Sequence, residues 1–77
     1  MTVHVPLGED ADHVRLLLFT TAYRKVLDQE LGPMAAGMND VVLILRDSKG
    51  KPLSNGMYYI VINTENARAI GKLLILR

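Results

Sequence analysis

The sequence HVRLLLFTTAYRKVLDQELGP at residues 13–33 is compatible with either one helix or two strands, and the class of the domain depends on which of them forms. As a helix, its apolar residues recur near every 3.6 positions, Asp12 could cap the start and a Gly-Pro pair could end it. As strands, VRLLLFTT is an apolar run of strand length, and RKVLDQEL follows after a turn at residues 22–24. Periodicity alone does not separate the two for short apolar runs.

On both sides of this segment the sequence is typical of strands. Several stretches are rich in β-branched and aromatic residues and are bounded by turn-forming residues. The connection DSKGKPLSNG supplies Gly, Pro, Ser and Asn, which favour turns, and TENA is short enough for a hairpin. The expected strands are TVHV (2–5), DVVLILR (40–46), MYYIVIN (57–63) and RAIGKLLILR (68–77).

A series of motifs along the chain resembles one known family. Its elements are strands at Val14–Thr20 and Arg24–Leu31, an aspartate and glycine at Asp47 and Gly50, the sequence NGMY at 55–58, and a closing GKLLILR at 71–77. This order resembles the immunoglobulin-like module of the bacterial flagellar hook-cap scaffold, and related C-terminal sorting and attachment domains of secreted bacterial proteins.

The resemblance implies an all-β fold, a two-layer antiparallel immunoglobulin-like sandwich of about six to seven strands. Residues 1–77 would form one module, either alone or as part of a longer secreted protein. The alternative is an α+β domain with a helix at 13–31. The sequence departs from the family at TTAYRK, where many relatives place a glycine, and in lacking a portion often found before the first strand.

Composition restricts the function. The chain has 77 residues, 49% apolar and 22% charged, with no cysteine, so it is a folding domain without disulfides or thiolate metal ligands. It has no apolar run of the roughly 18 residues needed to span a bilayer. A net charge of +1 argues against nucleic acid as a partner. Residues 1–40 carry a net charge of −3 and residues 41–77 of +4, which could orient head-to-tail contacts between copies.

Residues with metal-binding or catalytic chemistry are few. His4 and His13 have no third histidine or cysteine to complete a transition-metal site. The carboxylates of Glu9, Asp10 and Asp12 are clustered, but they lack the spacing of a dedicated calcium loop. No nucleophile with a base, and no phosphate-binding loop, is recognisable. We therefore expect neither an enzyme nor a bound cofactor.

The strand SNGMYYIVI at residues 54–62 is apolar on both faces. Tyr58, Ile60 and Ile62 share one face, expected to point inward, with the Tyr58 hydroxyl tying a corner of the sandwich. An antiparallel sheet with one wet face should alternate apolar and polar residues, so the outer face is expected to be covered by something else. The predicted interface residues are Met57, Tyr59, Val61, Leu74 and Leu76.

Three functions agree with these features. The favoured one is a non-catalytic module that self-associates or docks in an extracellular or cell-surface bacterial assembly, through apolar outer faces and edge strands. Its partners would be further copies, as a homo-oligomer or filament, or a parent domain. The second is a C-terminal sorting or anchoring domain of a larger secreted protein. The third is a small intracellular α+β binding protein.

Overall fold

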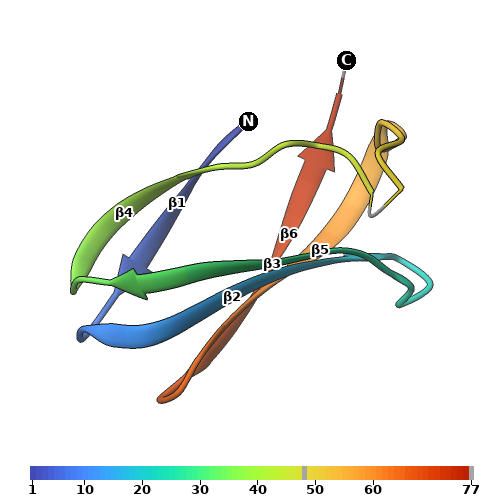
Figure 1. Cartoon of the computed structure of the whole chain (residues 1–77). Coiled ribbons are helices and arrows are strands. Elements are labelled where there is room, and N and C mark those ends of the chain that lie inside the picture. Colours follow the sequence, from blue (N-terminus) through green and yellow to red (C-terminus); the bar gives the residue numbers. More distant parts are fainter. Residues whose placement is uncertain (48, 77) are drawn as a thin grey trace.

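The computed structural model describes residues 1–47 and 49–76, which form six antiparallel strands in two layers (Figure 1). The all-β prediction is confirmed, and the alternative helix at 13–31 is wrong. Within these residues no helix exists that is long and apolar enough to cross a membrane. The strands are β1 (Thr2–Leu7), β2 (Ala11–Thr20), β3 (Lys25–Met34), β4 (Gly37–Val42), β5 (Gly56–Thr64) and β6 (Arg68–Ile75).

The ambiguous segment at 13–33 forms the β2–β3 hairpin. Leu16 and Leu18 are fully buried, whereas the intervening Leu17 is half-buried on the opposite face. Burial therefore repeats every two residues, as in a strand. The turn is closed by the Tyr23 N–H, which donates to the Thr20 carbonyl oxygen at 2.9 Å. The run of three leucines thus supplies both faces of one strand.

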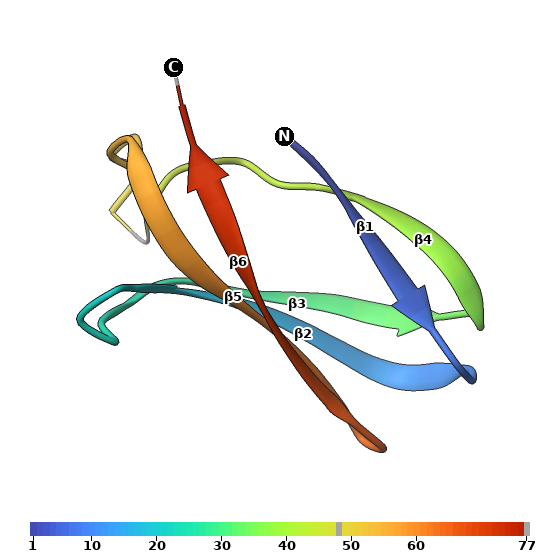
Figure 2. The same cartoon turned by 180° about the vertical axis from the view of Figure 1, so that it is seen from behind.

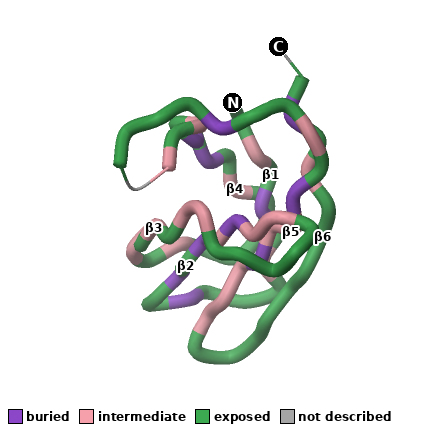
Figure 3. Tube along the Cα trace, turned by 90° about the vertical axis from the view of Figure 1, so that its right-hand side faces the viewer, coloured by how far each residue is buried: buried purple, intermediate pink, exposed green. Residues whose placement is uncertain are grey.

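The two layers differ in width. One sheet has four strands in the order β3-β2-β5-β6, and the other has two, β1 and β4. Figure 2 shows β1 lying between β4 and β6, across from the larger sheet. Figure 3 marks the buried positions along both layers, and their side chains form one core between the sheets. This core consists of Val5, Leu16, Leu18, Val41, Leu43, Leu53, Tyr58 and Ile75.

Most strand ends differ from the sequence prediction by a few residues, and three of these differences have consequences for the edges and the core. β1 continues through Pro6 to Leu7, because an edge strand can hold a proline whose missing N–H faces away from the ladder. β4 begins at Gly37, three residues before the predicted 40–46, and ends at Val42, although Leu43 stays in the core. The predicted closing strand reaches Ile75, and its last residue, Arg77, lies outside the described residues, as does Ser48.

The connection between β4 and β5 is held by local hydrogen bonds. The Asp47 carboxylate accepts the backbone N–H groups of Lys49 and Lys51, each at 2.9 Å, and these bonds hold its pKa below the usual value. Further along, the Tyr58 hydroxyl donates to the Ser54 carbonyl oxygen at 2.7 Å. The prediction that Tyr58 points inward and ties a corner is confirmed.

Candidate interaction surfaces

The outer face of the β5–β6 hairpin carries most of the predicted interface residues. Met57 lies opposite Leu74 in the β5–β6 ladder, and Leu76 follows just beyond the end of β6. These side chains are 43%, 50% and 75% exposed. Tyr59 is half-buried. Together with Ile70, which is also exposed, they form a surface that we call the outer apolar patch: Met57, Tyr59, Ile70, Leu74 and Leu76.

Val61 is the exception among the predicted interface residues. Strand alternation places it on the outer face, yet it is only 4% exposed, so its own side chain offers little surface to a partner. Its partners in the ladders on either side are Leu17 and Ile70, two larger apolar residues. Val61 therefore supports the outer apolar patch from beneath.

An aromatic stack extends the outer apolar patch toward the β2–β3 turn. The rings of Tyr23 and Tyr59 are parallel to within 6°, with centroids 5.5 Å apart. Tyr23 is exposed and adopts a positive φ of 63° in the turn. Phe19 lies beside Tyr59 in the β2–β5 ladder. Sequence reasoning missed Tyr23 and Ile70, because their positions follow from strand register and turn geometry.

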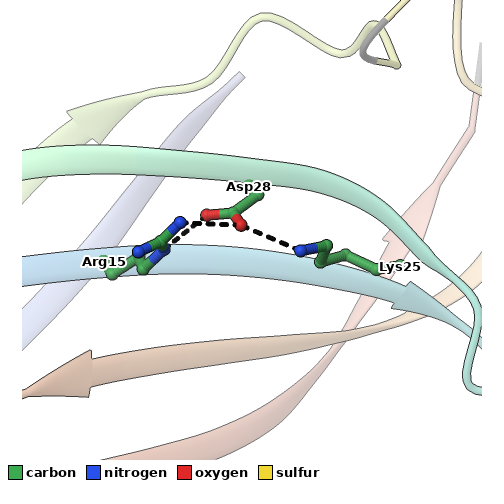
Figure 4. A network of polar contacts seen from close by, with 3 residues as sticks. All are labelled: Arg15, Lys25 and Asp28. Carbon is green, nitrogen blue, oxygen red and sulfur yellow. Dashed lines mark hydrogen bonds and ion pairs between the residues drawn. The ribbon is translucent and has the colours of Figure 1, made fainter.

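A charged network occupies the part of the same face that β2 and β3 form (Figure 4). Arg15 donates to Asp28 through Nε at 2.6 Å and through Nη2 at 3.0 Å. Lys25 Nζ contacts the second oxygen of Asp28 at 3.0 Å. The hydrogen bonds from Arg15, and then from Lys25, lower the pKa of Asp28 to about 2. The network holds two positive charges and one negative charge, its Arg15–Asp28 bonds connect β2 to β3, and it bounds the outer apolar patch.

The outer face of the smaller sheet is also partly apolar. Met38, Val42 and Ile44 are exposed there. Between Met38 and Val42 lies Asp40, whose carboxylate oxygen is 2.5 Å from Nδ1 of His4 on β1. The two layers therefore present apolar surfaces on opposite sides of the sandwich, one containing Lys72 and the other Asp40.

A groove of about 330 Å³ lies between β1 and β6. It exists because the two-stranded sheet is narrower than the four-stranded sheet, so the inner face near β6 is incompletely covered. Small residues contribute as well, since Gly71 lies opposite Ile60 and Ala69 lies opposite Ile62. The groove is lined mainly by apolar residues of both layers.

Of the side chains considered for metal binding, those of Asp10 and His4 have hydrogen-bond partners within the fold. Asp10 accepts the backbone N–H of Ala36 at 2.7 Å. The backbone N–H groups of Asp12 and His13 donate to the Glu65 carboxylate, which lowers its pKa and holds the β5–β6 turn against the start of β2. Within residues 1–47 and 49–76, no three His, Cys, Asp or Glu side chains are grouped to hold a metal ion.

These observations define the chain as a small antiparallel β-sandwich whose exposed features are apolar surfaces and strand edges. No family model matches the sequence, and no curated protein matches it. Among solved structures, it is similar to the crystal structure of FlgD from P. aeruginosa, with a TM-score of 0.78 and 20% sequence identity. The match covers 95% of this chain and 58% of the FlgD chain. The similarity shows a shared fold, in agreement with the resemblance to the hook-cap module.

Proposed function

We propose that this chain is a non-catalytic structural module that self-associates within an extracellular or cell-surface bacterial assembly. The observation that carries the proposal is the outer apolar patch. Leu74 and Leu76 are exposed by half or more on a face where a solvated antiparallel sheet ordinarily places polar side chains. Contiguous apolar surface of this kind marks protein interaction sites.

The structural neighbour supports the same kind of role. FlgD is a flagellar hook-cap protein, and its chain contains the same fold over most of the present sequence. On that basis the partners of this chain are further copies or other components of a surface assembly. The proposed role requires no catalytic residue, cofactor or nucleic acid.

A second function is a sorting or anchoring domain at the C-terminus of a larger secreted protein. It is favoured by the limited coverage of the neighbour, since the matched region spans only 58% of the FlgD chain. In this case the outer apolar patch contacts a parent domain instead of another copy. The third function considered from the sequence, an intracellular α+β binding protein, required a helix at 13–31 that is absent from the structure.

The size of the protein as a function of its concentration distinguishes these functions. Light scattering, combined with negative-stain imaging of the same samples at low and high salt, would reveal ordered oligomers or filaments if the module self-associates. Binding through an apolar surface should persist at high salt, because salt screens charges and not apolar contacts. A monomer at every concentration would contradict self-association and favour contact with a parent domain.

A further inference from the structure

The four free strand edges of the sandwich are not equivalent. β1 and β4 are the edges of one sheet, and β3 and β6 are the edges of the other. β1 contains Pro6 and β3 contains Pro33, and a proline on an edge hinders the addition of another strand. β4 and β6 contain no proline. Strand addition is therefore expected at β4 and β6.

We propose that β4 of one copy pairs antiparallel with β6 of the next copy, with Asp40 directly opposite Lys72. The proposal rests on the proposed self-association and names the contact that produces it. In the described part of the chain, β4 pairs with β1 alone and β6 with β5 alone. Each strand therefore has one side along which a second copy can add.

The hydrogen bonds of each ladder identify the backbone groups on the free sides. Leu43 and Met1 exchange backbone bonds at 2.7 and 3.1 Å, so odd-numbered residues of β4 point their N–H and C=O groups toward β1. The Thr64 N–H donates to the Ala67 carbonyl oxygen at 2.8 Å, so odd-numbered residues of β6 point toward β5. On both strands the even-numbered residues direct their N–H and C=O groups to the free side. These residues also carry the outer-face side chains.

Side chains along the two edges are complementary in one register. With Lys72 opposite Asp40 of the next copy, the charges attract, and every neighbouring outer-face pair on either side is apolar. Each of these four apolar side chains is large and exposed in the isolated domain. The apolar pairs are Ile70 with Val42 and Leu74 with Met38.

Charge also argues against pairing of an edge with its own copy. The charged outer-face residues of β6 are Arg68 and Lys72, both basic, and that of β4 is Asp40. Two copies of β6, or two of β4, therefore bring only like charges together, whereas the mixed pair brings opposite charges together. Opposite charges facing each other across strands stabilise a sheet and like charges destabilise it. The charges therefore favour a contact in which one copy supplies β4 and a second copy supplies β6.

Such a contact is heterologous, because it joins two different edges on two different layers. Each copy keeps one free β4 edge and one free β6 edge, so addition continues until a ring closes or a filament grows. The outer apolar patch lies along β5 and β6, and it would continue onto the apolar outer face of the neighbouring β4.

Reversing the charges tests the contact. Asp40→Lys places a lysine opposite Lys72, and Lys72→Asp places an aspartate opposite Asp40, so each variant alone should self-associate about tenfold more weakly or worse. An equimolar mixture of the two variants should regain association, because every β4–β6 contact between unlike variants joins opposite charges. The double variant should associate like the wild type. Lys49→Asp, in the β4–β5 connection, is the matched control and should change little.

Disulfide trapping provides a second measurement that does not depend on charge. The chain has no cysteine, so a mixture of Asp40→Cys and Lys72→Cys variants can form a mixed disulfide only between those positions. Directly opposite residues that exchange backbone bonds have Cα atoms about 5.5 Å apart, within disulfide range. The pair Asp40→Cys with Arg68→Cys lies four residues out of register and should cross-link far less.

The outcomes separate this inference from the proposed function. If the wild type assembles but charge reversal has no effect and the two cysteine pairs cross-link equally, the β4–β6 contact is refuted while self-association stands. If the wild type stays monomeric and neither pair cross-links, both are refuted. Far-UV circular dichroism of each variant establishes that it retains the all-β fold.

Discussion

The hydroxyl group of Tyr58 donates a hydrogen bond to the backbone carbonyl oxygen of Ser54 at 2.7 Å, which fastens β5 to the connection that leads into it. Tyr58 is buried among the core residues. Tyr58→Phe keeps the ring and removes the bond, so we expect the free energy of unfolding to fall by about 1 kcal/mol. Urea unfolding of this variant would measure the loss.

Tyr59→Phe is the matched control for this hydrogen bond. It removes the hydroxyl of the neighbouring residue, whose ring stacks on Tyr23 and remains in place. The control should unfold at nearly the same urea concentration as the wild type. Equal stability of Tyr58→Phe and Tyr59→Phe would show that the Ser54 bond contributes nothing.

Stability in acid should depend on Asp28. Its pKa is lowered from 3.8 to about 2 by hydrogen bonds from Arg15 and then Lys25, so folding favours the ionised carboxylate. The resulting stabilisation is fully present above pH 3.8 and is lost as the pH falls through about 2. We expect an NMR titration of the Asp28 carboxyl group to give a midpoint well below that of an ordinary aspartate, and Arg15→Gln to raise it.

Asp28→Asn provides the corresponding stability measurement. This variant should lose less stability than the wild type between pH 4 and pH 2, and the remaining loss would come from Asp47 and Glu65, whose pKa values are also lowered. High salt should weaken the difference, because Arg15 and Lys25 are about half exposed. Parallel stability curves for the two proteins over this range would rule out the Asp28 contribution.

In the turn between β2 and β3, a glycine at position 23 should give a more stable protein than an alanine does. Tyr23 has a φ of 63°, a conformation that costs an L-residue roughly 1 kcal/mol but costs glycine little. Tyr23→Gly and Tyr23→Ala both remove the stack on Tyr59. We therefore expect the glycine variant to be the more stable by about 1 kcal/mol in thermal or urea unfolding. An alanine variant that is equally or more stable would show that the turn is not strained.

Gly71 and Gly56 should respond to alanine in opposite directions. A Cβ at Gly71 would make an ordinary contact at 3.5 Å with Ile60, and Gly71 lies within β6, so Gly71→Ala should stabilise the fold by about 0.5–1 kcal/mol. Gly56 has a φ of 147°, so Gly56→Ala should destabilise it. In calorimetry, Gly71→Ala should melt at a higher temperature than the wild type and Gly56→Ala at a lower one. A lower melting temperature for Gly71→Ala would contradict it.

Much of the fold was predictable from local sequence. The segment at 57–63 has β-branched and aromatic residues between turn formers, and β5 covers all of it and one further residue at each end. The inward position of Tyr58 follows from strand alternation, and its bond to Ser54 from the way that sandwich folds use tyrosine at a corner. By contrast, residues 13–33 satisfied both a helical and a strand pattern, and resemblance to a family was needed to choose between them.

The surface was less predictable, because it depends on which residues become neighbours. Alternation alone places Val61 outward, but its neighbours Leu17 and Ile70 come from two other strands, and the buried state of Val61 became visible only with the register. The stack of Tyr23 on Tyr59 joins residues 36 positions apart through a turn with a positive φ. The groove between β1 and β6 depends on the unequal widths of the two sheets, which no local pattern encodes.

Leu74 allows the outer apolar patch to be tested without disturbing the core. Its side chain is half exposed on the outer face, while its neighbours Leu73 and Ile75 face inward. Leu74→Lys should leave the free energy of unfolding within about 0.5 kcal/mol of the wild type, because the aliphatic part of lysine can cover the same surface. Self-association should weaken, since the ammonium group would have to be desolvated in an apolar contact.

Asn66→Lys is the control for the added charge. It places a lysine in the exposed β5–β6 turn, near the opposite end of β6 from Leu74. Sedimentation velocity over a range of concentrations should show weaker association for Leu74→Lys than for Asn66→Lys. If both variants weaken association equally, net charge is responsible and the outer apolar patch is not the contact. If neither does, the copies meet through another surface, and the exposed leucines of β6 require a parent domain to cover them.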